Sequence, residues 1–342
     1  MSTIKEIARR TNLSVGTVSL VLNGRGDEMR ISKKTQKKIF EAAQGMGYIP
    51  NMAARRLRQS HIRSIPIIVI FWPSDLSSDI LGRFIIGAQN SVLDQEYEFE
   101  LAIQPYNRDR LDKIKDICDR GIYHAAIFTG LSTKEQHYLE ENPLSIPTVL
   151  FNRTSHVYSC VYVDTYEIGR KSAELFMSRG HKRVGTIVSD HLYNSEHNLR
   201  YIGFVESCQT YGLELNQQHI QVAPMTMEGG NIAAKNIIEA GGLLPTAMFF
   251  PFGLMAIAAL PRFHQAGIKI PEHMEILSYG DSEAEKYSVP ALSSVKLSVE
   301  DMSTACVRLA LGMLHDGSTK SKSIVFETPF IFRESCGGFL PF

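Results

Sequence analysis

The chain has 342 residues, of which 44% are hydrophobic and 21% charged, so it has room for two or three globular domains with a substantial core. Its net charge is zero, but residues 1–60 hold 12 Lys and Arg against 4 Asp and Glu. The rest of the chain carries the matching negative excess. This asymmetry argues against a polyanion partner for the body and predicts one for the basic head.

No stretch approaches the ~20 consecutive apolar residues of a membrane span. Met1 leads directly into a polar helix, without the apolar region of a signal peptide. The five cysteines are scattered and form no Cys-x-x-Cys pair, which predicts buried thiols in a reducing compartment. We therefore expect a cytoplasmic protein.

Residues 4–23 have the pattern of two short helices joined by a tight turn. Thr3 and Glu6 form a capping-box pattern before the first helix, and Ser14 can cap the second. Small Ala8 lies where two helices of a helix-turn-helix must cross closely. The inward-facing apolar residues at helical spacing are Ile4, Ile7, Ala8, Val18, Val21 and Leu22.

The outward face of the second helix is small and uncharged, whereas a solvated helix usually presents Lys and Glu. Such a face suits a helix inserted into the DNA major groove, where hydroxyls meet phosphates and base edges. The alternative is an ordinary helical pair that packs on another surface. The outward residues are Val15, Gly16, Thr17, Ser19 and Leu20.

Residues 32–46 predict a third helix capped by Ser32, with lysines near its start for phosphate contact. Its inner stripe is Ile39, Phe40, Ala43 and Met46, and its lysines are Lys33, Lys34, Lys37 and Lys38. Residues 51–58 form a potential helix too short to be stable alone, so we expect a partner to order it. We interpret residues 59–64 as a linker.

From Ile65 onward, apolar runs bounded by turn residues alternate with helical patterns. This alternation predicts βαβ units with parallel sheets, and about a dozen strands predict two lobes. The expected strands are 65–71, 98–104, 125–130, 148–152, 160–164, 183–190, 219–224, 246–252 and 274–281, with a helix ending near Leu93 after the first.

The chain resembles the lactose/galactose/purine repressor (LacI/GalR) family of bacterial transcription regulators over essentially its whole length. The most specific stretches are TIKEIARRTNLSVGTVSLVLNG (3–24) and GYIPNMAARRL (47–57), which are similar to the family's helix-turn-helix and hinge helix. The resemblance implies a homodimer on a pseudo-palindromic operator. It also implies a periplasmic-binding-protein-like body of two doubly wound parallel-sheet lobes, with a small effector between them.

On this basis, Leu57 matches the family's hinge leucine, which inserts into the minor groove. A plain linker residue is the alternative for Leu57. The expected DNA-contacting residues are Thr3, Val15, Gly16, Thr17, Ser19, Leu20, Asn23, Ala54 and Leu57.

The effector site departs from the family pattern. Phe252-Gly253 stands where relatives carry Asn-Asp, and Ser278-Tyr279-Gly280-Asp281 replaces Gly-Phe-Asp-Asp, leaving Asp281 as the surviving acid. Arg200 matches an effector-contacting arginine; a surface arginine is its alternative. Trp72 could equally well stack on a ligand ring or pack in the core. Arg153 could contact the effector or form a salt bridge at the rim of the site. The expected effector residues are Trp72, Arg153, Arg200, Phe252, Tyr279 and Asp281.

We expect a helix-turn-helix DNA-binding domain at 1–60 (helix-turn-helix 4–23, hinge helix 51–58) and an effector-binding, dimerising body at 62–342. Lobe 1 is expected at 62–163 and 292–325, and lobe 2 at 164–291 and 326–342. The interpretation is an effector-controlled repressor, with a sugar or a ring-bearing or anionic metabolite as effector.

The alternatives to this interpretation are a corepressor- or partner-dependent regulator, a solute-binding protein, and a ligand-processing enzyme fused to a DNA-binding head. A solute-binding protein fits poorly, because the head is basic and no signal peptide is evident. An enzyme would need a catalytic motif, and none is present. His181, His191 and His197 match no metal-ligand spacing, so no metal or other cofactor is expected.

Overall fold

The computed structural model divides into two compact units, residues 1–65 and 66–342. It describes residues 4–22, 26, 29–46, 65–74, 78–93, 98–107, 111–119, 121–189, 198–317 and 320–337. The expected hinge helix lies outside the described residues, as do Thr3, Asn23, Ala54 and Leu57.

The first unit contains three helices: α1 (Ile4–Thr11), α2 (Val15–Leu22) and α3 (Lys33–Gly45). Ser14 caps α2 by accepting a hydrogen bond from the backbone N–H of Thr17 at 3.0 Å, as its sequence predicts. The core consists of Ile7, Ala8, Val18, Val21, Ile39 and Ala43. Phe40, expected in the inner stripe, is instead 48% exposed, because the two short helices cover only a narrow face of α3.

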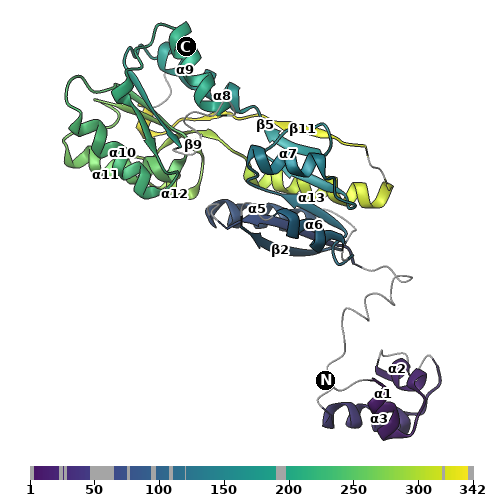
Figure 1. The fold of residues 1–342 in the computed structure, drawn as a ribbon. Helices are drawn as coiled ribbons and strands as arrows, with labels where there is room; N and C mark the ends of the chain where they lie inside the picture. Colours follow the sequence, from purple (N-terminus) through teal and green to yellow (C-terminus); the bar gives the residue numbers. More distant parts are fainter. Residues whose placement is uncertain are drawn as a thin grey trace. The chain divides into compact units, whose positions relative to one another are not determined.

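The first sheet of the body has the strand order β11-β5-β4-β3-β1-β2, and every pairing in it is parallel. Figure 1 shows the late strand β11 running beside β5. The strands are β1 (Ile67–Pro73), β2 (Glu100–Tyr106), β3 (Ala125–Phe128), β4 (Thr148–Phe151), β5 (Ser159–Val163) and β11 (Ser323–Phe326). The helices are α5 (Ser78–Leu93), α6 (Leu111–Asp119), α7 (Thr133–Glu141) and α13 (Val299–Asp316).

The second sheet has the order β12-β10-β9-β8-β6-β7, with only the short β12 antiparallel. Its strands are β6 (Val184–Ser189), β7 (Ile220–Ala223), β8 (Ala247–Phe250), β9 (Glu275–Gly280), β10 (Ser293–Lys296) and β12 (Phe330–Ile331). Its helices are α8 (Thr165–Ser178), α9 (Leu199–Thr210), α10 (Met227–Glu239), α11 (Gly253–Gln265) and α12 (Glu283–Lys286). Two short 3-10 turns, η1 (Gln217–His219) and η2 (Glu334–Cys336), complete it.

The boundary between the lobes differs from the expected one at residues 291/292. Residues 293–296 form β10, which pairs in parallel with β9, so they belong to the second sheet. The chain therefore returns to the first lobe only after Lys296, where α13 begins at Val299. This strand is only four residues long and rich in serine, which is why its pattern did not stand out.

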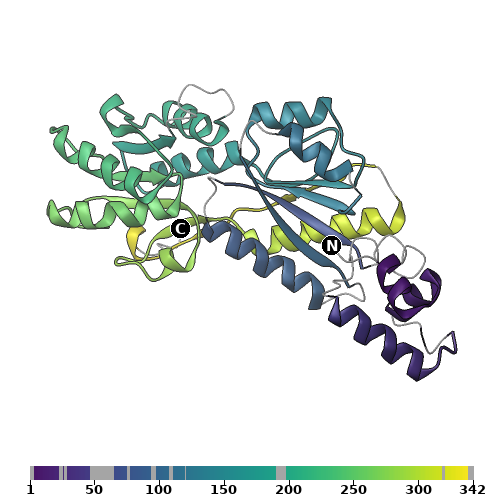
Figure 2. The same ribbon diagram turned by 60° about the horizontal axis from the view of Figure 1, so that its bottom comes forward.

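Helices cover both faces of each sheet, and the strand residues alternate between them. On β1, Ile68, Ile70 and Trp72 pack in the core with α5 and α13, while Val69 and Phe71 pack with α6 and α7. Figure 2 shows α13, in yellow, alongside α5, in blue. In the second lobe α8 packs with α9, and α10 packs with α11. All five cysteines are buried thiols, as predicted.

Candidate functional site

The head presents an uncharged surface on α2. Val15 is 46% exposed and Gly16 is also exposed, whereas Thr17, Ser19 and Leu20 are half-buried. These are the five residues predicted to face outward. Because α2 contains no charged side chain, a nucleic acid would meet hydroxyls and apolar groups there.

Lys37 and Lys38 of α3 contact other groups of the head. Lys38 donates a hydrogen bond from Nζ to the carbonyl of Thr11 at 2.9 Å and so caps the end of α1. Lys37 lies 3.9 Å from Glu41 in an exposed pair, which contributes little to stability. Lys38 is therefore part of the head's own architecture, in addition to any phosphate contact.

A cavity of about 270 Å³ lies between the two lobes of the body. Its walls come mostly from segments that follow strands, which is where open α/β sheets bind ligands. The lining residues include Asp79, Arg83, Gly130, Phe151, Asn152, Arg153, Arg200, Pro251, Phe252, Gly253, Tyr279, Gly280, Ser282 and Glu285. Four of the six predicted effector residues are among them: Arg153, Arg200, Phe252 and Tyr279.

Arg200 is one of the three arginines that line this cavity. Its guanidinium carbon lies 3.8 Å from the centre of the Tyr279 ring, and Nη1 donates to the carbonyl of Pro251 at 2.7 Å. Its Nε is buried and has no hydrogen-bond partner among the described residues. Burial lowers the pKa of Arg200, and the Tyr279 phenol opposes this effect. The alternative of a surface arginine does not fit this position.

Two further polar atoms of the lining are buried without a hydrogen-bond partner among the described residues: Oδ1 of Asn152 and the hydroxyl of Tyr279. Burial raises the pKa of Tyr279, while the positive charge of Arg200 lowers it. Buried polar groups normally have partners, so unpaired ones around a single cavity indicate a site built for a polar ligand.

Two other arginines of the lining already donate hydrogen bonds to protein groups. Arg153 donates to the carbonyl of Leu131, from Nε at 2.9 Å, and Nη1 donates to the carbonyl of Asn152. Arg83, which the sequence reasoning missed, binds Glu300 through two hydrogen bonds of 2.7 and 2.8 Å. Both arginine side chains are therefore held in place by protein acceptors and form part of the cavity wall.

Trp72 and Asp281, also predicted at the site, do not line the cavity. Trp72 is 4% exposed and packs edge-on against Phe84, which corresponds to its core alternative. Asp281 is held in an ion pair with Arg333 and accepts a hydrogen bond from the Ser294 hydroxyl. Two acids line the cavity, Asp79 and Glu285, and no sequence prediction placed either of them at the site.

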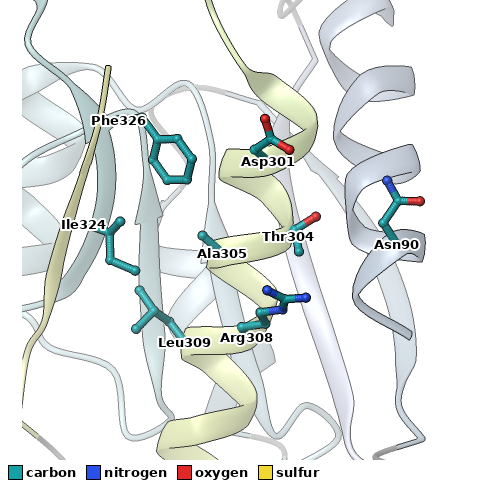
Figure 3. A pocket seen from close by; sticks show the side chains of 8 residues that line it. All are labelled: Asn90, Asp301, Thr304, Ala305, Arg308, Leu309, Ile324 and Phe326. Atoms are coloured by element: carbon teal, nitrogen blue, oxygen red, sulfur yellow. The ribbon is translucent and has the colours of Figure 1, made fainter. Parts of the chain in front are cut away.

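A second, larger cavity of about 770 Å³ lies on the first lobe. Figure 3 shows α13 between β11 and α5, with Ile324 and Phe326 of the strand facing Ala305 and Leu309 of the helix. Asp301, Thr304 and Arg308 of α13 lie toward Asn90 of α5. Because β11 is the edge strand of its sheet, this surface includes an unpaired strand edge.

Within the described ranges, no group of His, Cys, Asp and Glu is arranged to hold a metal ion. His181 instead shares a hydrogen bond of 3.0 Å between Nδ1 and the Thr246 hydroxyl, while His191 and His197 lie outside these ranges. Among the helices that the structure describes, none is long and apolar enough to cross a membrane.

Residues 3–51 match the family model of bacterial regulatory proteins of the lacI family, and residues 159–336 match the periplasmic binding protein-like domain. The chain is 26% identical to the HTH-type transcriptional regulator GalS of Salmonella typhimurium, over 91% of this chain and 89% of that protein. It is 24% identical to the HTH-type transcriptional repressor PurR of Pasteurella multocida, over 98% of each.

Among solved structures, a LacI family transcription regulator from Clostridium acetobutylicum is 32% identical, with a TM-score of 0.73, over 78% of this chain and 99% of that one. A complex of the transcriptional regulator CelR with cellobiose shares the fold, at 20% identity and a TM-score of 0.68 over 98% of this chain and 100% of that one. The helix-turn-helix head, the two-lobed body and these similarities together show that the chain belongs to the LacI family of bacterial transcription regulators.

Proposed function

We propose that the chain is a cytoplasmic repressor whose affinity for its operator changes when a small polar metabolite, such as a sugar, binds between the two lobes. The observation that carries this proposal is the set of three buried, unpaired polar atoms around the cavity, on Asn152, Arg200 and Tyr279. They leave donors and an acceptor ready for a ligand that bridges the two lobes.

The α2 face supplies the DNA contacts in this proposal. Thr17 and Ser19 bind phosphates or base edges, while Val15, Gly16 and Leu20 make apolar contacts with bases. Leu57 and Ala54 of the hinge contact the minor groove, and Thr3 and Asn23 flank the helix-turn-helix. The charge excess of the head supplies the phosphate attraction.

Effector binding controls the operator by changing how the lobes close, which alters the ordering of the two hinge segments on DNA. Coupling of this kind is typically worth about 1–3 kcal/mol, or roughly 5- to 150-fold in affinity. A corepressor- or partner-dependent regulator is the second candidate. The departures from the family pattern at Phe252 and Gly253 favour it, since they alter the site where relatives carry Asn-Asp.

Operator selection tests the DNA-binding part directly. The full chain, incubated with a library of random duplexes, is expected to enrich a pseudo-palindromic sequence, and a chain lacking residues 1–60 is expected to enrich none. A thermal-shift screen of sugars, nucleosides and carboxylates on the full chain then tests the cavity. Enrichment of sequences without twofold symmetry would argue against a dimeric repressor.

We propose a homodimer that uses the surface of α13 and β11 around Leu309. This surface combines apolar Leu309 and Phe326 with charges of both signs, Asp301 and Arg308, and could therefore complement a second copy of itself. Leu309→Glu places a charge at its apolar part and is expected to yield monomers in sedimentation measurements. Leu243→Glu is the control, because Leu243 is 68% exposed on the second lobe. A Leu309→Glu variant that stays dimeric would place the interface elsewhere.

A further inference from the structure

Two glycines of the effector cavity have the same neighbour. Gly253 begins α11, and a Cβ atom placed on it would lie 2.1 Å from Cδ of Glu285. Gly280 ends β9, and a Cβ atom there would lie 3.0 Å from Oε2 of the same glutamate. The carboxylate of Glu285 therefore occupies the space that a side chain at either position would need.

Glu285 is 1% exposed, yet it lines the cavity. Oε1 accepts a hydrogen bond from the Ser278 hydroxyl at 2.5 Å, and Oε2 accepts one from the backbone N–H of Ser282 at 2.6 Å. A carboxylate offers about four acceptor positions, so about two remain. No Lys, Arg or His among the described residues pairs with it.

The two glycines, Gly253 and Gly280, stand at positions where the family pattern has acidic residues. A side chain at Gly253 would overlap the Glu285 carboxylate, and a side chain at Gly280 would be crowded by it. The absence of carboxylates at positions 253 and 280 and the presence of the Glu285 carboxylate beside them therefore depend on each other.

We propose that Glu285 acts as an acceptor in the effector site and determines specificity by accepting a hydrogen bond from a hydroxyl of a neutral, polyhydroxylated ligand. An anionic group at this end of the cavity would meet like charge. A hydroxyl donates to a carboxylate without that cost. This inference rests on the proposed function, since it assigns a role within the same effector cavity.

Glu285 also closes a capping box with Ser282 at the start of α12, and that role alone would account for its backbone contact. The chain contains a matched case. Glu135 closes the same box with Ser132 at the start of α7 and is 3% exposed, but it does not line the cavity. A glutamine at either position can keep the capping contact while removing the negative charge.

The experiment compares the full chain with Glu285→Gln and Glu135→Gln by titration calorimetry. The probe is the sugar that raises the melting temperature of the wild type most, from a panel of aldoses, polyols and disaccharides that includes D-galactose and cellobiose. Glu285→Gln is expected to bind this probe roughly 10- to 100-fold more weakly, because a hydrogen bond to a charged acceptor is lost. Its melting temperature without sugar should stay near that of the wild type, and Glu135→Gln should bind like the wild type.

Equal affinity of Glu285→Gln and the wild type would overturn the role of Glu285 while leaving the proposed function intact. A wild type that binds no sugar in the panel would contradict the sugar-controlled function, and this inference with it.

A second pair of variants tests the shared space without any ligand. Gly253→Asp alone should lower the melting temperature, because its side chain overlaps the Glu285 carboxylate. The double variant Gly253→Asp/Glu285→Ala should recover most of that loss. Failure of Glu285→Ala to rescue Gly253→Asp would overturn the exchange of one acid for the other.

Discussion

The head and the effector cavity differ in how they assemble a binding surface. The head presents five neighbouring residues of one helix, whose shared face follows from the helical repeat. The cavity gathers side chains from both lobes, and the acceptable residue at one position depends on residues far away in the chain, as Gly253 depends on Glu285. Surface contacts of the head should therefore respond to mutation nearly independently, whereas cavity residues should respond in groups.

The largest effect is expected from a charge in the core of the head. Val21 is 1% exposed, and Val21→Asp buries an unpaired carboxylate in a core of only a few residues. We expect complete loss of operator binding, with the melting transition of the body unchanged in calorimetry. A variant that still binds the operator at wild-type affinity would show that this core does not hold the DNA-binding surface.

Salt should also have a large effect, and only through the head. A protein with six or more phosphate contacts loses on the order of a thousandfold in affinity between 50 and 200 mM salt. We expect a loss of this size for operator binding, measured by fluorescence anisotropy, because the excess of Lys and Arg lies in residues 1–60. Sugar binding to the body should change far less. An operator affinity independent of salt would exclude phosphate neutralisation by the head.

Arg200→Ala should abolish most effector binding. It removes the unpaired Nε, the stacking on Tyr279 and a buried positive charge, so we expect a loss of roughly 100-fold in calorimetric sugar affinity. Operator affinity without effector should not change. Arg200→Lys keeps a charge but not the planar group, and should recover only a small part of the loss. Wild-type affinity in Arg200→Ala would remove this residue from the site.

A smaller and more selective effect is expected at Leu57. If this residue inserts between bases at the operator centre, Leu57→Ala should weaken specific binding by roughly tenfold, since only the bent complex uses the wedge. Binding to a random duplex at the same salt concentration should change little. Parallel losses on both duplexes would indicate that Leu57 is an ordinary linker residue.

The regular parts of the fold were accessible from sequence because they depend on local patterns. The two-residue period of β1 directs Ile68 and Ile70 to one face of the sheet and Val69 to the other, and apolar runs bounded by turns predicted most strands. Strand β10 was missed because it has only four residues, two of them serines, and its place is determined by pairing with β9. Phe40 has the helical spacing of the core residues of α3, but it is exposed because α1 and α2 cover only a narrow face of that helix.

The cavity could be predicted only in part. Arg200, Phe252 and Tyr279 followed from the family resemblance, and all three line it. Glu285 did not, although its Ser-x-x-Glu pattern was visible, because such a pattern predicts a helix start and not the direction of the carboxylate. Asp281 matches a family acid, yet it pairs with Arg333 from a segment about fifty residues later.

Effector control is tested by measuring the operator affinity of the wild-type full chain at one salt concentration, with and without a saturating amount of the best-binding sugar. We expect the affinity to change roughly 5- to 150-fold, which corresponds to a coupling free energy of about 1–3 kcal/mol. The same operator affinity with and without a sugar that demonstrably occupies the cavity would contradict effector control.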